Sequence, residues 1–279
     1  MSATRPYIPR IALVFDFDET LAPDTFDTLF ERLPMSRDEW QERYADPRQG
    51  EGWDQIIGRT QAFILAMRDM GQPLTGDWLR EAGEAYDLYD GVEAMPERLR
   101  EAAREVCAEA ELHFVVLSSG YADLIKHTKL GGLFDRIWGS SIHFGEDGTA
   151  ETIKRTIPHP QKARYIEALS KGLPVTGSNG PENSDTPVAP SDRFVPMDQV
   201  IYVGDGASDL QAFTFTEREG GIALAVHQDG GLGGEVDDDE RPQDMEPPDY
   251  AEGGAMLEAL ALAVRSHAAR LELKRRGTR

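Results

Sequence analysis

The sequence predicts an α/β fold in which helices cover both faces of a parallel sheet. Apolar runs typical of buried strands occur at 11–17, 112–117, 200–203 and 222–226, and helical patterns follow the last three. Strands that alternate with helices are typical of a Rossmann-like three-layer core. The interval after the first run has helical periodicity instead, which indicates a small α-helical unit inserted there.

Composition limits the partners of the chain. Its 279 residues carry 50 acidic and 29 basic side chains, a net charge of -21. This charge repels phosphate backbones and anionic lipids, so we expect no nucleic-acid partner and no membrane partner. No apolar stretch reaches the roughly 18 residues of a membrane span, and no secretory cleavage pattern is found. A single cysteine, Cys107, excludes internal disulfides. We therefore expect a cytoplasmic protein.

The helical unit follows the first strand directly. A short amphipathic segment at 25–33 precedes two longer predicted helices, whose apolar residues recur at helical spacing over 53–67 and 78–89. Trp40, Trp53 and Trp78 lie in this unit, and we expect them to form its own small core rather than a ligand pocket. The predicted boundaries are residues 23–91 for the helical unit, and residues 1–22 with 92–279 for the α/β core.

The rest of the chain contains one hairpin, two loops and a helix. A Gly-Glu-Asp-Gly turn between short alternating runs predicts a β-hairpin within 137–157. Residues 172–197 are rich in Pro, Gly, Ser and Asn, and residues 229–249 are strongly acidic, so both are predicted to be flexible surface loops. Residues 252–275 form the last predicted helix.

Reactive side chains follow the predicted strands. Asp16 and Asp18 close the first strand, and carboxylates this near one another favour a shared proton or a bound cation. Ser118 and Ser119 close the second strand just before a helical pattern, where hydroxyls and free N–H groups make an anion cradle.

Two further places complete the pattern. Lys162 lies early in a predicted helix, and the strand at 200–203 leads into Gly204-Asp205-Gly206 and Asp209, whose carboxylates can hold a hard cation. All of these ligands are oxygen and the six histidines show no close metal-ligand spacing, so Mg²⁺ is favoured over zinc. The glycines lack the spacing of a dinucleotide-binding loop.

These four segments together resemble the motifs of the haloacid dehalogenase superfamily. The segments are DFDET from Asp16, VVLSSG ending at Gly120, Lys162, and GDGASD from Gly204. The inserted helical unit resembles the cap of the phosphoserine-phosphatase-like branch. The resemblance implies an α/β core with a helical cap domain.

The same resemblance implies roles for the motif residues. Asp16 would be the nucleophile that forms an aspartyl-phosphate, and Asp18 would protonate the leaving oxygen and then activate water. Ser118 and Lys162 would hold the phosphoryl group, with Ser119 beside them. Mg²⁺ would be bound by Asp16, the backbone carbonyl of Asp18 and Asp205, with Asp209 supporting that site.

The expected function is therefore that of a Mg²⁺-dependent phosphatase acting on a small-molecule phosphate ester. A phosphomutase or phosphotransferase on the same core and a non-catalytic phosphate-responsive binding module are the alternatives. Thr25 stands where phosphoserine phosphatases usually carry a glutamate, so the sequence leaves the ester unidentified. It gives no oligomeric state. We expect the helical unit to close over the site on hinges near 22–24 and 90–91.

Overall fold

The computed structural model describes residues 6–175, 180–227, 242 and 244–277, which form a seven-stranded sheet. The strand order is β4-β3-β2-β1-β5-β6-β7, and all neighbours run parallel except β3 and β4. The strands are β1 (Arg10–Phe15), β2 (Glu111–Tyr121), β3 (Arg136–Phe144), β4 (Ala150–Arg155), β5 (Val200–Gly204), β6 (Ile222–Val226) and β7 (Asp244–Glu246). The predicted α/β fold is confirmed.

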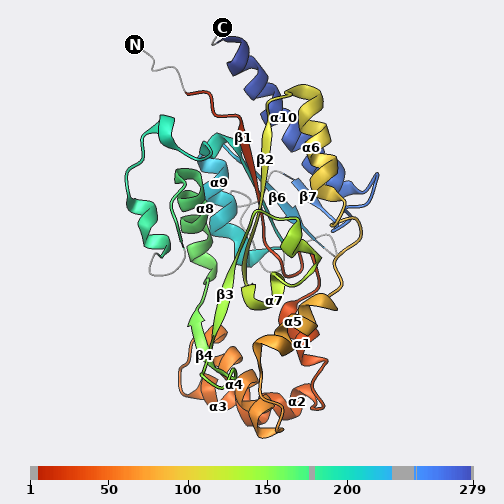
Figure 1. Ribbon diagram of the computed structural model, residues 1–279, viewed down its shortest axis with the longest axis vertical. Helices are drawn as coiled ribbons and strands as arrows, with labels where there is room; N and C mark the ends of the chain where they lie inside the picture. The colour runs from red at the N-terminus through yellow and green to blue at the C-terminus, as the bar shows by residue number, and fades with distance from the viewer. Residues whose placement is uncertain (1–5, 176–179, 228–241, 243, 278–279) are drawn as a thin grey trace.

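Helices cover both faces of this sheet (Figure 1). One face carries α6 (Met95–Val106) and α10 (Ala255–Gly277), which pack against each other. The other carries α8 (Lys162–Lys171) and α9 (Leu210–Arg218). The short helix α7 (Ala122–Ile125) follows β2. Single 3₁₀ turns occur at Lys129–Gly132, His159–Gln161, Pro181–Asp185, Pro190–Asp192, Met197–Gln199 and Ala207–Asp209.

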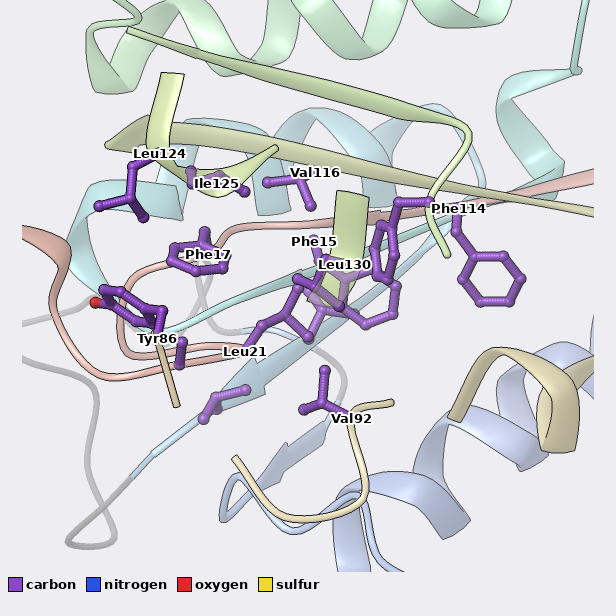
Figure 2. Packing of buried hydrophobic residues seen from close by; sticks show 14 of the residues in the cluster. Phe15, Phe17, Leu21, Tyr86, Val92, Phe114, Val116, Leu124, Ile125 and Leu130 are labelled. Carbon is purple, nitrogen blue, oxygen red and sulfur yellow. The ribbon is translucent and has the colours of Figure 1, made fainter. Parts of the chain in front are cut away.

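The central strand β1 shows how the sequence orients the site. Ile11, Leu13 and Phe15 pack in the core beneath α6 and α10, whereas Ala12 and Val14 pack on the α8 and α9 side. Figure 2 shows the part of the first core around Phe15. This alternation follows from the period of two in a strand. The N–H of the next residue, Asp16, continues the ladder by donating to the carbonyl of Val203 at 2.8 Å. The side chain of Asp16 therefore faces α8.

A helical segment lies between β1 and β2, as predicted, at the lower end of the molecule in Figure 1. It contains α1 (Thr25–Phe30), α2 (Arg37–Trp40), a π-helical turn at Gln41–Ala45, α3 (Asp46–Gly50), α4 (Gln55–Asp69) and α5 (Gly76–Glu84). Asp24 and Asp54 cap the N-termini of α1 and α4 by accepting hydrogen bonds from backbone N–H groups.

Two details of this segment differ from the expectation. Trp40 is buried among Phe26 and Phe30, but Trp53 precedes α4 and remains 43% exposed, so it does not belong to the core. The periodicity over 78–89 overestimates α5, which ends at Glu84. Tyr86, beyond this end, instead donates from its hydroxyl to the carbonyl of Pro23 at 2.7 Å.

The predicted hairpin is formed by β3 and β4, which pair antiparallel on either side of the turn at 145–149. Its tip reaches the helical segment. The N–H of Ala150 donates to the carbonyl of Leu74 at 2.7 Å, and Thr75 and Thr149 form an antiparallel bridge. The hairpin thus joins the sheet to the helical segment at the N-terminal end of α5.

The two predicted loops lie partly outside the described residues, since 176–179, 228–241 and 243 are not among them. Described parts of 180–197 form short 3₁₀ turns. Within 229–249, residues 244–246 form β7, a strand that the sequence did not predict because two of its three residues are acidic. Across the described chain, no helix has the length and hydropathy needed to cross a membrane.

Candidate active site

Three neighbouring strands bring the predicted site residues to one edge of the sheet. Phe15 at the end of β1 pairs with Val116 on one side and with Val203 on the other. The residues that follow these positions include Asp16 and Asp205, so segments far apart in sequence converge. β1 lies between β2 and β5, so the connections that leave these strands at this edge run to opposite sides of β1. Ligands of parallel sheets bind at such points.

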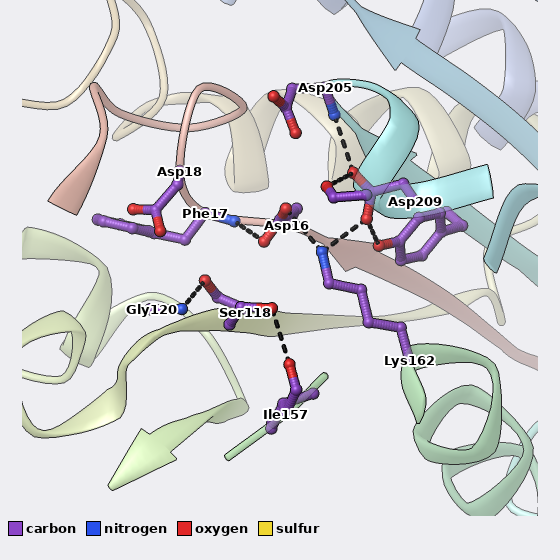
Figure 3. A network of polar contacts seen from close by, with 12 residues as sticks. Asp16, Phe17, Asp18, Ser118, Gly120, Ile157, Lys162, Asp205 and Asp209 are labelled. Atoms are coloured by element: carbon purple, nitrogen blue, oxygen red, sulfur yellow. Dashed lines mark hydrogen bonds and ion pairs between the residues drawn. The ribbon is translucent and has the colours of Figure 1, made fainter. Parts of the chain in front are cut away.

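Asp16 and Asp209 share the ammonium group of Lys162 (Figure 3). Lys162 Nζ lies 2.7 Å from Asp16 Oδ2 and 2.6 Å from Asp209 Oδ1. Lys162 and Asp209 are fully buried and Asp16 is 5% exposed. Buried charges of this kind persist only when they are paired, and here one cation joins two anions.

Electrostatics fixes the charge states of this group. Burial alone would lower the pKa of Lys162, but the carboxylates of Asp16 and Asp209 raise it, so the ammonium stays charged. Burial also acts against ionisation of Asp209, yet Lys162 and a hydrogen bond from Tyr202 hold the pKa of Asp209 below its usual value. The hydroxyl of Tyr202 donates to Asp209 Oδ1 at 2.5 Å. Burial raises the pKa of Tyr202 well above its usual value, so the phenol keeps its proton.

Asp16 and Asp18 lie on either side of Phe17 in the sequence, and Asp18 is hydrogen-bonded to the first residue of α1, Thr25. Its Oδ1 accepts hydrogen bonds from both the N–H of Thr25, at 2.8 Å, and the hydroxyl of the same residue. Burial, with the nearby charges of Asp24 and Asp16, raises the pKa of Asp18 to about 7. A carboxyl group with this pKa can hold and release a proton near neutral pH.

Ser118 and Ser119 lie in β2 where its pairing with β3 is irregular. The register between β2 and β3 shifts between Leu117 and Tyr121, so the residues between them leave the regular ladder. Ser118 is fully buried and its Oγ accepts from the N–H of Gly120 at 2.9 Å. Ser119 lines the site cavity, and its Oγ donates to the carbonyl of Ile157 at 2.7 Å.

Asp16, Asp205 and Asp209 form the group that can hold a metal ion. One carboxylate oxygen from each lies within 4.8 Å of the other two. Burial and the charges of Asp16 and Asp209 raise the pKa of Asp205 to about 8, while burial, offset by Lys162, raises the pKa of Asp16 to about 6. Crowded carboxylates with raised pKa values fit a hard divalent cation. The carboxylate of Asp18 does not belong to this group of three.

A cavity of about 190 Å³ lies over these groups. Its wall includes Glu19, Asp24, Arg59 and His159 beside the residues above. Glu19 has a left-handed backbone with φ 55°, and its carboxylate accepts from the N–H of Asp24 at 2.9 Å and from the hydroxyl of Tyr89 at 3.1 Å. The turn after Asp18 is therefore joined to both ends of the helical segment.

Sequence reasoning did not identify two residues that donate hydrogen bonds to the aspartates of this site, Thr25 and Tyr202. In the sequence, Thr25 stands only where phosphoserine phosphatases usually carry a glutamate. Nothing in the pattern predicts its hydrogen bonds to Asp18. Tyr202 did leave a signal, because a phenol in the otherwise aliphatic strand β5 needs a buried hydrogen-bond partner. Asp209 is that partner.

The comparison with protein families is decisive. The family model described as haloacid dehalogenase-like hydrolase matches residues 13–214, which include every motif residue above. The chain belongs to this family. Haloacid dehalogenase-like hydrolases are enzymes, and the resemblance seen in the motifs is thereby confirmed.

Individual relatives of this hydrolase are distant. An uncharacterized protein of Borreliella burgdorferi is 21% identical over 226 residues, covering 73% of this chain and 77% of that protein. A probable phosphoserine phosphatase from Vibrio cholerae has a TM-score of 0.54 at 15% identity, covering 98% of this chain and 69% of that one. A haloacid dehalogenase family hydrolase from Salmonella enterica serovar Typhi has a TM-score of 0.51 at 16% identity, covering 77% and 61%. These structures share the fold.

Proposed function

We propose that this hydrolase is a Mg²⁺-dependent phosphatase that cleaves a small-molecule phosphomonoester through an aspartyl-phosphate on Asp16. The observation that carries the proposal is the contact between Asp16 and Lys162 at 2.7 Å, beside a second carboxyl group with a pKa of about 7. Phosphoryl transfer requires an aligned nucleophile and positive charge around the transferred oxygens, and these residues provide both.

In the first step, a carboxylate oxygen of Asp16 forms a bond to phosphorus while the bond from phosphorus to the ester oxygen breaks. Asp18 gives its proton to the departing oxygen. In the second step, Asp18 takes a proton from water as the water oxygen attacks phosphorus. The bond between phosphorus and Asp16 then breaks, releasing inorganic phosphate and regenerating the free carboxylate.

Thr25 supports Asp18 in this exchange. Its N–H and hydroxyl both donate to Oδ1 of Asp18, so the other oxygen, Oδ2, carries the mobile proton. Among the described residues, Lys162 donates two of its three N–H groups to Asp16 and Asp209, which leaves the third for a phosphoryl oxygen.

Asp16, Asp205 and the backbone carbonyl of Asp18 would hold Mg²⁺, with Asp209 beside them. When bound, the ion would supply positive charge to the phosphoryl oxygens and reduce repulsion among the carboxylates. The oxygen-only donor set described above supports this choice of metal.

The size of the cavity favours a small ester, and Arg59 suggests an anionic group on the leaving alcohol. Of the seven arginines of residues 23–91, Arg59 lines this cavity. Its guanidinium carbon lies 4.7 Å from the centre of the Phe26 ring, and its buried Nε has no hydrogen-bond partner among the described residues. A carboxylate or second phosphate would provide that partner.

The test is hydrolysis of p-nitrophenyl phosphate and a panel of small phosphomonoesters, with Mg²⁺ and with EDTA. We expect turnover only with the metal, loss of at least about 10³-fold in kcat for Asp16→Asn, and no change for Asp38→Asn, a surface acid in α2. Activity that survives Asp16→Asn would contradict the proposed nucleophile.

Analysis of the product formed in ¹⁸O-labelled water separates the alternatives. A phosphatase transfers the phosphoryl group to water, so product phosphate acquires one oxygen from ¹⁸O-labelled water. A mutase or phosphotransferase places it on a second alcohol instead. A binding module would retain the phosphoryl group on Asp16 without turnover.

A further inference from the structure

The phenol of Tyr202 is a buried polar group that the steps above do not use. Tyr202 is fully buried in the middle of β5, where its ring packs edge-on against Phe213 with centroids 5.6 Å apart. The hydroxyl reaches past this apolar contact to Asp209 Oδ1 at 2.5 Å. Phenylalanine would fill the same packing position, so the oxygen is present for its hydrogen bond.

Asp209 is held by donors on both of its oxygens. Oδ1 accepts from Tyr202 and from Lys162, and Oδ2 accepts from the N–H of Asp205 at 3.1 Å and the hydroxyl of Ser208 at 3.3 Å. These donors come from β5, α8 and the turn after β5. A carboxylate bonded on both sides by separate elements has one orientation available to it.

This orientation determines where the ammonium of Lys162 lies. Lys162 reaches the site from the first residue of α8 through a flexible four-carbon chain, and its nitrogen contacts two carboxylates, Asp16 and Asp209. If Asp209 rotates, the nitrogen moves with it, and the distance to Asp16 changes.

We propose that Tyr202 is a positioning residue that acts through Asp209 to hold Lys162 against Asp16. The inference rests on the proposed function, because it concerns the lysine that meets the transferred phosphoryl group. Tyr202 contacts neither the substrate cavity nor Asp16 in any described hydrogen bond. Its effect belongs to the rate of phosphoryl transfer rather than to the binding of the leaving group.

The experiment compares Tyr202→Phe with Tyr44→Phe. Tyr44 is the matched control because its buried phenol also donates to a carboxylate, Asp69 Oδ2 at 3.2 Å, within the helical segment. With p-nitrophenyl phosphate and Mg²⁺, we expect kcat to fall at least about tenfold in Tyr202→Phe with KM changed less than threefold. Tyr44→Phe keeps both values within about twofold.

A double mutant tests whether the effect passes through Asp209. In an Asp209→Ala background, Tyr202→Phe should change kcat by no more than about twofold, because the acceptor of the phenol hydrogen bond has already been removed. A folded Tyr202→Phe enzyme with normal kcat, or a full additional loss in the Asp209→Ala background, would overturn the inference.

A measurement without turnover separates this inference from the proposed function. If the wild-type protein hydrolyses no phosphomonoester, the proposed function fails. The position of Lys162 is then followed by NMR of ¹³Cε-labelled lysine, with the signal assigned by Lys162→Arg. A shift of this signal in Tyr202→Phe, absent in Tyr44→Phe, supports the positioning role, and an unmoved signal refutes it.

Discussion

Gly120 shows how closely the side chains of the site are packed. A Cβ atom at this position would lie 2.8 Å from Asp18 Oδ2 and 3.2 Å from Ser118 Oγ. These atoms belong to groups whose positions the proposed chemistry depends on. The close approach of β2 to Asp18 therefore requires a residue without a side chain.

We expect Gly120→Ala to lower kcat on p-nitrophenyl phosphate by about 10²-fold, because the added methyl group displaces the carboxyl that exchanges protons. Steady-state kinetics on the folded variant provides the measurement. Gly132→Ala is the control, since a Cβ there meets nothing within 4 Å. Normal kcat in Gly120→Ala would show that Asp18 tolerates displacement.

Arg59 provides a second residue-scale test. We expect Arg59→Ala to raise KM at least about tenfold for esters whose alcohol carries an anion, and to change KM little for p-nitrophenyl phosphate. Arg68→Ala is the matched control, because Arg68 is exposed on the same helix, α4. An equal increase of KM for both kinds of ester would contradict selective recognition of the leaving group.

At the residue scale, the sequence predicted those groups whose chemistry is unusual for their location. Paired acids at the end of an apolar run drew attention to Asp16, and the Gly-Asp-Gly turn drew attention to Asp205. In the sequence alone, Lys162 resembles an ordinary surface lysine, and only its combination with the other motifs indicates a role in the site. Thr25 could not be predicted, because its role depends on the backbone turn at Glu19, and spacing along the chain does not reveal that turn.

The helix α10 contains a buried titratable side chain, His267, that is fully removed from solvent. Burial and the charge of Arg270 lower the pKa of His267 to about 4, with Lys274 acting in the same direction and Asp198 opposing them. The folded protein therefore keeps the imidazole neutral, whereas the unfolded chain takes up a proton below its ordinary pKa of 6.5.

From this shift we expect the free energy of unfolding to fall as the pH decreases from about 6.5 to about 4, by on the order of 3 kcal/mol from this side chain. Urea denaturation across that range measures the loss. His267→Leu should remove this contribution, while His143→Gln, a change at an exposed position in β3, should retain it. An unchanged pH dependence in His267→Leu would assign the loss to other groups.

At the element scale, strands with long apolar runs were predictable and short polar ones were not. Runs at 11–17 and 200–203 identified β1 and β5 because buried strands need continuous apolar residues on both faces. The strand β7 has no such run, and it pairs with β6 while Met245 packs against the core on the α8 and α9 side. The predicted end of α5 is too late because Tyr86 and Tyr89 continue the helical spacing in the sequence. In the structure both lie beyond the helix, and their hydroxyls donate to Pro23 and Glu19.

For the whole molecule, the expected closure of the helical segment stays a prediction. Its two connections lie side by side, since the N–H of Tyr89 donates to the carbonyl of Leu21 at 2.9 Å. The second connection is also held by the core, because the N–H of Tyr250 donates to the carbonyl of Asp90 at 3.1 Å.

We expect Mg²⁺ with beryllium fluoride, which mimics a phosphorylated aspartate, to slow hydrogen exchange at 22–24 and 90–91, since closure would shield both connections together. Mass spectrometry on the wild-type protein gives the measurement, and Asp16→Asn, which cannot form the adduct, is the control. Equal exchange with and without the mimic would remove the hinges from the proposal.

The contacts between the hairpin tip and residues 74–75 attach the helical segment to the core in addition to the two chain connections. Because the hairpin holds this segment as well as the two chain connections, we expect a large movement of the segment to require bending of the hairpin or loss of the bridge at Ala150. We therefore expect the hairpin to limit the size of the molecules that can enter. Lengthening the turn at 145–149 would loosen this tether and admit larger esters, without any change among the residues that contact phosphorus.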